Sequence, residues 1–339
     1  MINVGVIGLG MMGLTHLDVY ADSKLARVVA VADADKGRLD GSVKARGNVD
    51  GQAKGKFDVT TVKGYADAIA LINDPAVQMV DVCLPTPLHK KFGIAVLEAG
   101  KHLLMEKPLA RTSADAFALA DAADAAYAKS KTLAMPAMCM RFWPGWNWLK
   151  KAVAENTYGK VLSAKFTRLA SHPGGPFYLS NDASGAAALD LHIHDTDFVQ
   201  HLFGMPKSVS SRGYSKLTAG VDHLNTVYEF ADTPLVTAEG GWCMADGFPF
   251  QMRYQVNFEK ATAVFDIAAS ENLTLSQGGK SEAVAIETAG GYEQEIEYFL
   301  TCINTKTRPT IVTLRDAANA VKIVEAEVES VRTGVAVGI

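Results

Sequence analysis

The chain has 339 residues, of which 48% are hydrophobic and 21% charged, and this length suits two packed domains. Such a composition excludes intrinsically disordered, collagen-like and coiled-coil proteins. The formal net charge is −4 and no basic block occurs, which argues against nucleic acid or an anionic membrane surface as a partner. Apolar runs fall well short of the ~18–20 residues that a membrane span needs.

The cysteines and the N-terminal residues indicate in which cellular compartment the protein is expected. The four cysteines, at positions 83, 139, 243 and 302, form no C-x-x-C pair, which is typical of a reducing environment rather than of a disulfide framework. The first residues have neither the basic region nor the small-residue cleavage site of a signal peptide. We therefore expect a cytoplasmic protein.

Short β-branched runs alternate with Ala- and Leu-rich stretches over the first ~130 residues, which is the pattern of βαβ units and a parallel sheet. The pattern predicts helices at 12–21 and 88–99. It predicts strands at 4–7, 28–32, 77–84, 102–105 and 133–138. Residues 48–56, which contain several glycines and lysines, are expected to form a surface loop.

Gly8, Gly10 and Gly13 form a G-x-G-x-x-G motif between the first predicted strand and the first predicted helix. Gly8 would allow the tight turn, Gly10 the approach of a pyrophosphate, and Gly13 the close packing of helix on strand. The N–H groups at the helix start would bind the phosphates. We therefore expect Met11 and Met12 to contact a dinucleotide together with the three glycines. A strand–helix turn without a ligand is the alternative.

The choice of dinucleotide depends on Asp33, which follows Gly13 by 20 positions at the end of the second predicted strand. A carboxylate there accepts hydrogen bonds from the adenosine ribose and repels a 2′-phosphate. The sequence therefore favours NAD over NADP. Lys36 and Arg38, just downstream, either weaken this preference or form a solvated helix start.

Pro85, Thr86 and His89 lie in a stiff loop after the predicted strand at 77–84, where ligands bind in open α/β sheets. We expect all three to contact the cofactor. Thr86 could instead cap the following helix, and His89 could be an ordinary histidine at a helix start.

Glu106, Lys107 and Pro108 follow the predicted strand at 102–105. A lysine at the carboxyl end of a parallel strand is well placed to touch a substrate oxygen, and we expect Glu106 and Lys107 to lie beside the cofactor. The proline predicts a fixed turn and is compatible with a cis peptide. An ordinary surface lysine is the alternative.

Several motifs occur in an order that resembles one family: the glycine motif, CLPTPLH at 83–89, EAGKH at 98–102, EKPL at 106–109 and RFWP at 141–144. The likeness continues in D-x-x-x-H-x-x-D at 190–197 and LRDA at 314–317, and so covers nearly the whole chain. The chain thus resembles the glucose–fructose oxidoreductase, inositol dehydrogenase and rhizopine-catabolism (Gfo/Idh/MocA) oxidoreductases.

This resemblance implies an α/β protein of two domains. Residues 1–125 would form an NAD(P)-binding Rossmann domain with a doubly wound parallel sheet. Residues 126–339 would form an α+β domain for substrate binding and oligomer formation, with a large, mostly antiparallel open sheet. Its last helix would lie at about 315–333. We expect the reaction in the cleft between the two domains.

Asp190, His194 and Asp197 would share one face of a helix because they are four and three positions apart. A histidine titrates near neutral pH and can accept a hydroxyl proton while a nicotinamide takes the hydride. The family pattern assigns catalysis to Lys107, Asp190 and His194. His194 would be the general acid/base, Asp190 its partner, and Lys107 would hold the reacting oxygen.

The same stretch allows two other interpretations. It offers five potential metal ligands, but His192 and His194 diverge by roughly 200° on a helix and could not share an ion. We therefore expect no metal. The second alternative is a buried histidine that a neighbouring carboxylate satisfies.

Arg141 and Trp143 follow the predicted strand at 133–138 and would suit a sugar or cyclitol ring, through hydroxyl contacts and an apolar ring face. A packing cluster of Trp143 with Trp146 and Trp148 between the domains is the alternative.

Asp197 and His172 are further candidates for contacts to substrate hydroxyls. Relatives commonly have glycine where this chain has His192, so His192 is expected to narrow the pocket or to hydrogen-bond in it.

Alternating patterns predict five strands in the second half, at 226–230, 235–242, 252–258, 262–267 and 272–275. One face of their sheet would have little to cover it, and apolar sheet faces are commonly buried in oligomers. We expect a homodimer or homotetramer formed through this sheet.

The sequence therefore predicts an NAD-dependent oxidoreductase. It would transfer a hydride between nicotinamide and a secondary hydroxyl or ketone of a sugar, a sugar derivative or inositol. One alternative is a glycosidase that uses NAD for transient oxidation and elimination. The other is a nucleotide-binding sensor without catalysis. Which polyol is the substrate does not follow from the sequence.

Overall fold

The computed structural model describes residues 1–43 and 55–339, so most of the loop predicted at 48–56 lies outside the described residues. The chain forms two compact units. The first contains Met1–Cys139 and Tyr292–Ala318, and the second contains Met140–Gly291 and Asn319–Ile339. Each unit is described by itself.

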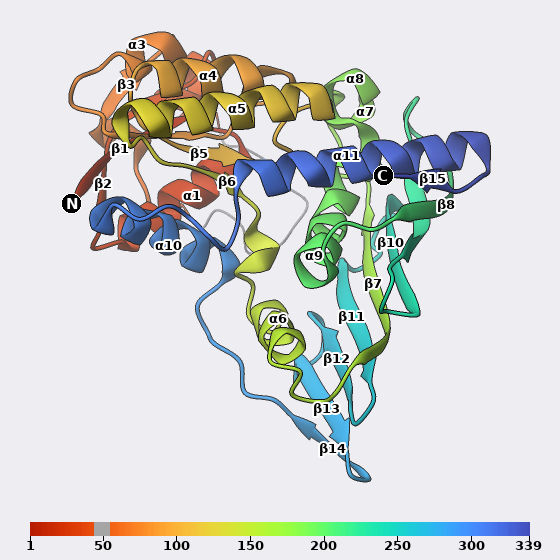
Figure 1. The fold of residues 1–339 in the computed structure, drawn as a ribbon. Coiled ribbons are helices and arrows are strands. Elements are labelled where there is room, and N and C mark those ends of the chain that lie inside the picture. Colours follow the sequence, from red (N-terminus) through yellow and green to blue (C-terminus); the bar gives the residue numbers. More distant parts are fainter. Residues whose placement is uncertain (44–54) are drawn as a thin grey trace. The chain divides into compact units, whose positions relative to one another are not determined.

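A parallel sheet of six strands forms the centre of the first unit (Figure 1). Along the sheet the order is β3 (Lys63–Tyr65), β2 (Ala26–Ala32), β1 (Ile2–Ile7), β4 (Met79–Val82), β5 (His102–Glu106) and β6 (Ala134–Ala137). The order reverses between β1 and β4, and ligands of open α/β sheets bind at the carboxyl ends of the strands at such a point. The predicted Rossmann fold is confirmed.

Helices cover both faces of this sheet (Figure 1). One face carries α1 (Met11–Asp22) and α10 (Gly291–Thr305), and the other carries α3 (Ala68–Ile72), α4 (His89–Glu98) and α5 (Ser113–Ser130). Because both faces are covered, the central strands are mostly buried, and β4 is buried at every residue. Short helical turns complete the unit: α2 (Lys36–Leu39), η1 (Val59–Thr61) and η2 (Thr86–Leu88).

The second unit contains a nine-stranded sheet. Its order is β14 (Lys280–Ala283), β13 (Leu273–Gln277), β12 (Thr262–Asp266), β11 (Gln251–Phe258), β7 (Val161–Ser171), β10 (Leu235–Met244), β9 (His223–Glu229), β8 (Ser208–Tyr214) and β15 (Val337–Gly338). Strands β7 and β10 pair in parallel, and the other described pairs are antiparallel. The predicted second fold is confirmed.

Helices α6 (Trp146–Ala154), α9 (Ile193–Phe203) and α11 (Leu314–Thr333) lie along one face of this sheet (Figure 1). Trp146 is fully buried beneath them and packs against four aromatic rings, Phe166, Phe198, Tyr254 and Phe265. This aromatic core fixes α6 and α9 on the sheet. The remaining turns are η3 (Cys139–Arg141), α7 (Pro176–Leu179), α8 (Asn181–Ser184) and a π-helical turn at Ala188–His192.

The compact units do not coincide with the domain division predicted at 125/126. Strand β6 pairs with β5, so the first unit continues to Cys139. Helix α10 also belongs to the first unit although it follows the second sheet in the sequence. The last helix, expected at about 315–333, is α11 (Leu314–Thr333).

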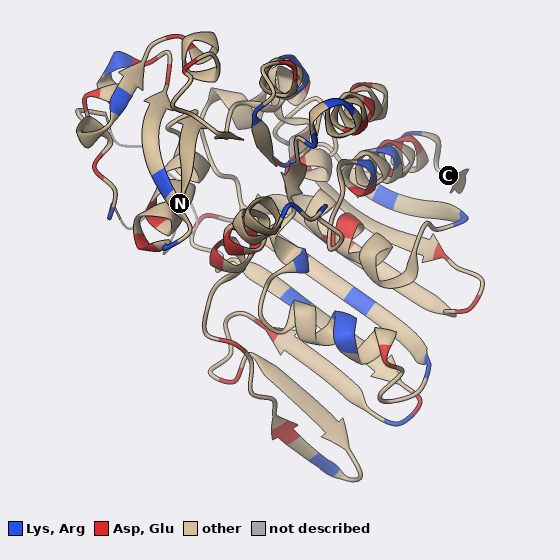
Figure 2. Ribbon diagram, turned by 60° about the vertical axis from the view of Figure 1, so that its left-hand side comes forward, with Lys and Arg blue, Asp and Glu red and all other residues tan. Residues whose placement is uncertain are grey.

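Lys and Arg are interspersed with Asp and Glu along the elements of both units (Figure 2). None of the described helices combines the length and the apolar character that crossing a membrane would require. All four cysteines are free.

Gly13 and Gly10 provide a test of the glycine turn. A Cβ at Gly13 would lie 1.8 Å from the backbone oxygen of Gly8, whereas one at Gly10 would meet nothing within 4 Å. We expect Gly13→Ala to lower the free energy of unfolding by about 3 kcal/mol or more, and Gly10→Ala by no more than about 1 kcal/mol. Urea denaturation measures both. Equal unfolding midpoints would contradict the close packing of α1 on β1.

Candidate active site

The glycine turn leaves the start of α1 open. Gly8 has a φ of 94°, and a Cβ there would lie 2.4 Å from the backbone oxygen of Cys83. Gly10 is the N-cap of α1, and no side chain caps the helix. The first N–H groups of the helix and the open space over Gly10 therefore fit a diphosphate.

Asp33, at the end of β2, holds the glycine turn in place. Its Oδ2 accepts a hydrogen bond of 2.8 Å from the N–H of Leu9, and its Oδ1 accepts one of 2.8 Å from the N–H of Asp35. The guanidinium of Arg38 lies 3.4 Å from Oδ2. The carboxylate is thus fixed at the strand end expected for ribose binding, with a cation beside it.

The loop after β4 is tied to the segment after β5 by His89. Its Nδ1 lies 2.8 Å from the carbonyl oxygen of Pro108, and its Nε2 lies 2.6 Å from that of Leu84. Burial lowers the pKa of His89, although both carbonyls oppose this shift. Thr86 is buried in the first turn of η2, and it caps neither η2 nor α4. The cofactor contacts of Pro85, Thr86 and His89 stay predictions.

Lys107 directly follows β5 and is half-buried. Its N–H donates a hydrogen bond of 2.8 Å to the Oε2 of Glu106, which is itself 5% exposed. The Lys107–Pro108 peptide is cis, as the proline suggested. The backbone that carries this lysine is therefore held by its own neighbour's carboxylate.

Asp190 and His194 lie on both sides of the junction between the π-helical turn and α9. From residue 184 to residue 200, only Asp190, Leu191 and His194 are not buried. The two predicted catalytic residues are thus both half-buried, one in a π turn and the other in the first turn of α9. Single π turns within helices occur frequently at functional sites.

Asp197 does not share that exposure, because it forms a buried ion pair with Arg141. The guanidinium Nε lies 2.9 Å from Oδ2, and its second nitrogen lies 2.7 Å from Oδ1. Both side chains are at most 3% exposed. The bidentate pair fixes α9 to the turn η3, and the substrate contacts expected of both residues stay predictions.

A second buried pair anchors α9 on the sheet. Arg168 of β7 donates to Asp195 through Nε at 2.7 Å, and its guanidinium lies 5.5 Å from the centre of the Trp146 ring. Asp195 is fully buried.

His192 is fully buried, and the expectation that it narrows the substrate pocket or hydrogen-bonds in it stays a prediction. Its ring is fully buried against β10, where a Cβ on Gly240 would lie 2.5 Å from Nδ1. Its Nε2 lies 3.4 Å from Glu327 Oε2 and 3.4 Å from the hydroxyl of Tyr228. Burial lowers the pKa of His192, but the charge of Glu327 raises it, and the net pKa is raised.

The other predicted substrate contacts come from different parts of the second unit. Trp143 is half-buried, whereas Trp146 is in the core and Trp148 packs on Tyr158 at 6.1 Å. His172 is half-buried, and its ring lies edge-on to Trp242 at 5.2 Å.

Sequence reasoning missed a polar group formed by His16 and Asp81, which are buried, and Cys83, which is half-buried. Among the described residues this group has the spacing of metal ligands, and the stretch at 190–197 does not. However, His16 Nδ1 already lies 2.9 Å from Asp81 Oδ2, and burial raises the pKa of Cys83 and keeps it a thiol. The group therefore suits a hydrogen-bond network better than a metal. The sequence did contain one indication of this group, because Asp81 is an acidic residue within the otherwise apolar strand β4.

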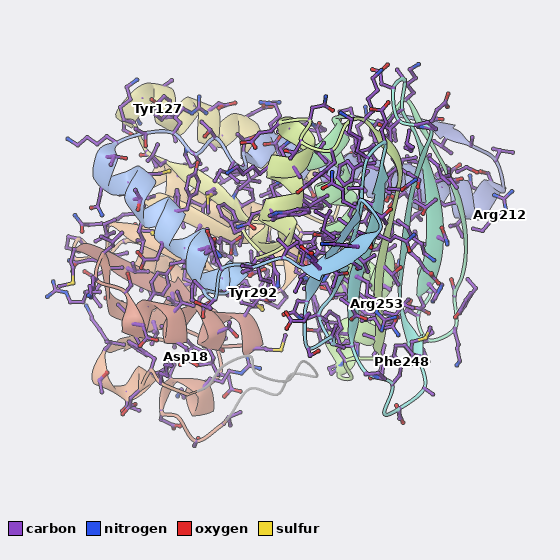
Figure 3. All side chains as sticks on the ribbon, turned by 90° about the horizontal axis from the view of Figure 1, so that it is seen from below. Asp18, Tyr127, Arg212, Phe248, Arg253 and Tyr292 are labelled. Atoms are coloured by element: carbon purple, nitrogen blue, oxygen red, sulfur yellow. The ribbon has the colours of Figure 1, made fainter. Side chains whose placement is uncertain are left out.

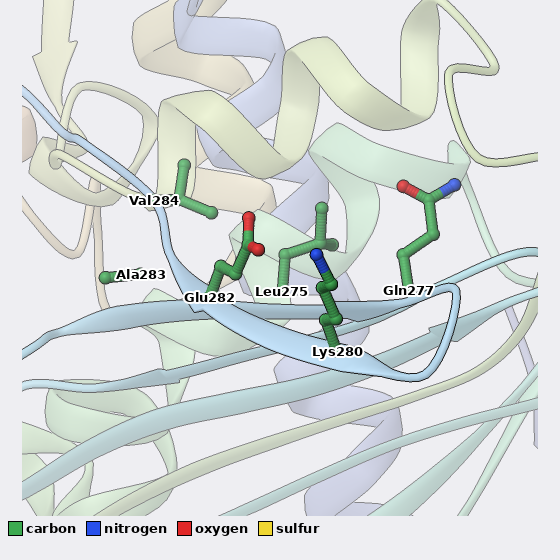
Figure 4. A pocket seen from close by; sticks show the side chains of 6 residues that line it. All are labelled: Leu275, Gln277, Lys280, Glu282, Ala283 and Val284. Carbon is green, nitrogen blue, oxygen red and sulfur yellow. The ribbon is translucent and has the colours of Figure 1, made fainter.

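A cavity of about 250 Å³ lies at the hairpin of β13 and β14 (Figure 4). None of the predicted site residues lines it. Its lining consists of Leu275, Gln277, Lys280, Glu282, Ala283 and Val284.

The close contact between His192 and Gly240 can be tested with a pair of substitutions, in which the second removes the overlap that the first creates. Gly240→Ala should lower the free energy of unfolding by about 2 kcal/mol, because the new methyl group overlaps the imidazole. In a Gly240→Ala/His192→Ala double variant the overlap is gone, so the loss should be smaller than the sum of the single losses by about 1 kcal/mol or more. Denaturant unfolding of the four proteins measures this coupling. Additive losses would contradict the contact.

Comparison with known proteins identifies the family of both units. The family model described as an oxidoreductase family with an NAD-binding Rossmann fold matches residues 2–131. The model of the GFO/IDH/MocA C-terminal domain matches residues 146–264.

Two curated relatives and one solved structure illustrate the similarity. The levoglucosan dehydrogenase of Pseudarthrobacter phenanthrenivorans is 31% identical over 217 residues, which cover 62% of this chain and only 53% of that protein. The scyllo-inositol 2-dehydrogenase (NADP(+)) of Bacillus subtilis is 23% identical over 97% of this chain and 93% of its own length. The chain thus spans about half the length of the first relative and nearly all of the second.

A solved structure of levoglucosan dehydrogenase in complex with NADH and levoglucosan has the same fold. Its TM-score is 0.83 at 22% identity, and the match covers 100% of this chain and 99% of that one. Since the two family models together match well over half of the sequence, the chain belongs to the Gfo/Idh/MocA family of oxidoreductases.

Proposed function

We propose that this protein is an NAD-dependent oxidoreductase that acts on a secondary hydroxyl, or the corresponding ketone, of a sugar, a sugar derivative or inositol. The observation that carries the proposal is the exposure pattern at 184–200. There Asp190 and His194 are the accessible titratable groups in an otherwise buried segment. Family membership and the half-buried Lys107 after β5 support it.

In the proposed mechanism NAD, held at the N-terminus of α1, would supply a hydride acceptor, and residues of this chain handle the proton. His194 accepts the hydroxyl proton, and Asp190 orients its imidazole and stabilises the charge that forms. Lys107 holds the reacting oxygen. The buried pairs of α9 keep His194 and Asp190 fixed, so most of the rate comes from positioning.

The proposed cofactor is NAD. The open N-terminus of α1 and the space over Gly10 suit a dinucleotide diphosphate. The fixed carboxylate of Asp33 disfavours a 2′-phosphate. Arg38, which lies beside it, and the relative named as NADP(+)-dependent make NADP the alternative to test.

The proposed substrate is a ring with several secondary hydroxyls. Levoglucosan and scyllo-inositol, named in two relatives, are both of this kind. Trp143 and His172 are proposed to contact it, because each is half-buried in the second unit. Arg141 and Asp197 would act on the substrate chiefly through α9, since they are paired and buried.

Lys107→Met tests the catalytic assignment. With a panel of polyols, aldoses and uronic acids, the wild-type protein should reduce NAD faster than NADP. The variant should lose roughly a hundredfold or more in kcat, because the reacting oxygen loses its partner, and should still bind NAD. Lys91→Met, at an exposed lysine of α4, is the matched control and should keep full activity. Undiminished turnover by Lys107→Met would overturn the assignment.

The same assay separates the alternatives. Hydrolysis of a glycoside without net NADH would indicate a glycosidase that oxidises its sugar transiently. Binding of dinucleotide and sugar without turnover of either would indicate a sensor.

The outward face of the nine-stranded sheet is proposed to join copies of the chain into a dimer or tetramer. This face is mixed rather than apolar, which corrects the sequence-based expectation. Its central row, in register across five strands, consists of Val227, Thr237, Lys165, Gln255 and Val264. Arg253, labelled in Figure 3, lies in a neighbouring row of the same face.

A cytoplasmic location is also proposed. It is supported by the four cysteines, all of which are free.

Val264→Lys tests this interface. Val264 is 39% exposed, and a charge there should shift the protein towards the monomer, because an unpaired buried ammonium is costly. Sedimentation velocity measures the mass. Leu179→Lys, at a side chain 51% exposed on α7, is the control and should leave the mass unchanged. A monomeric wild-type protein would contradict the proposal.

A further inference from the structure

Four ionisable side chains form a buried acid–histidine cluster in the first unit: His16, Asp81, Glu106 and Glu295. Glu106 is 5% exposed, and the other three are fully buried. Burying ionisable groups costs free energy unless they are paired, and an apolar core would be as stable. Packing alone therefore does not explain why these four ionisable side chains are buried together.

His16, on the inner side of α1, bridges two carboxylates. Its Nδ1 lies 2.9 Å from Asp81 Oδ2 on β4, and its Nε2 lies 3.3 Å from Glu106 Oε1 at the end of β5. The second contact is at ion-pair distance without the alignment of a hydrogen bond. A neutral imidazole has one N–H, so the imidazolium suits two carboxylates best.

The charge state of His16 agrees with this geometry. Burial lowers the pKa of His16, but the charge of Asp81 raises it, and the net pKa lies well above that of a free histidine. Asp81 is also held by the hydroxyl of Tyr20, which donates to Oδ2 at 2.8 Å. The cation is therefore fixed from the β4 side.

Helix α10 closes the cluster. Tyr292, labelled in Figure 3, lies with its ring 6.2 Å from that of His16. Glu295 has no hydrogen-bond partner among the described residues, and burial raises its pKa well above the usual value. As a neutral acid it adds no third negative charge. The two carboxylates at ion-pair distance from the imidazolium are thus Asp81 and Glu106, and Cys83 Sγ lies 3.6 Å from Nδ1.

The carboxylate of Glu106 connects His16 to the backbone at Lys107. While its Oε1 faces His16, its Oε2 accepts the N–H of Lys107 at 2.8 Å. One carboxylate thus joins the imidazolium to the peptide group that carries the Lys107 side chain. A shift of this peptide would move the lysine, and displacements of about 1 Å can cost a hundredfold in rate.

We propose that His16 is a positioning residue for Lys107: anchored by Asp81, it orients the carboxylate of Glu106, which fixes the peptide N–H of Lys107. This inference rests on the proposed function, in which Lys107 holds the reacting oxygen. It assigns no contact with substrate or cofactor to His16.

A double-mutant cycle tests the proposal in the full-length protein. His16→Gln and Glu106→Gln should each lower kcat about tenfold or more, while the substrate KM and the Kd of NADH change less than about threefold. Because both act on one chain of contacts, the double variant should be no slower than the slower single variant. His102→Gln, on the same strand as Glu106, is the matched control and should keep full kcat.

Three kinetic outcomes would overturn the proposal. An unchanged kcat in His16→Gln would show that Lys107 does not depend on it. Multiplying losses in the double variant would show independent effects. An equal loss in His102→Gln would show a general effect of altering the sheet. Thermal unfolding checks that each variant folds, and Glu106→Gln, which is isosteric, keeps the kinetic test open if His16→Gln does not fold.

Amide hydrogen exchange at Lys107 provides a readout that does not require activity. In His16→Gln this amide should exchange about tenfold faster, because Glu106 is no longer held in place to accept it. The amide of Leu104, within β5, should not change, nor should either amide in His102→Gln. Unchanged exchange at Lys107 would refute the chain of contacts. A wild-type protein inactive on all substrates would instead refute the proposed function alone.

Discussion

Buried ion pairs fix the segments of the chain that contain the candidate catalytic residues in place. In the second unit, Asp195 and Asp197 of α9 are each bonded to a buried arginine, Arg168 and Arg141. Removing one partner of such a pair leaves an uncompensated charge and costs about 3–5 kcal/mol. Asp190 and His194 therefore remain accessible on a helix that can hardly shift, and the exposed chemistry depends on the buried pairs.

Stability alone does not require these pairs, since apolar side chains of similar volume often serve a core as well. Ion pairs differ from apolar contacts in direction. A bidentate bond from Arg141 to Asp197 fixes both the distance and the rotation of α9, whereas leucines in the same place would permit it to slide. The π turn that begins this helix needs such control, because its winding differs from that of the α-helix that follows.

Sequence reasoning succeeded where one short segment contains the whole signal. The buried strands β1 and β4 follow from their β-branched runs, and the position of Asp33 directly after β2 was also predicted, while its contact with a cofactor stays a prediction. It failed where a partner lies far along the chain. Arg141 and Asp197 are 56 positions apart, and nothing local indicated their pairing. The return of α10 to the first unit was missed for the same reason.

The glycine motif at the start of α1 also determines where His16, on the same helix, lies. Gly13 brings the helix against the backbone of Gly8, and without that closeness its inner face could not reach the neighbouring strands. His16 lies one turn further along on the same face, and so its ring contacts Asp81 on β4 and Glu106 on β5. The close packing that Gly13 permits thus also places an imidazolium beside the strand that precedes Lys107. The helix start proposed to bind a diphosphate and the peptide group of Lys107 therefore both depend on the packing of the same helix.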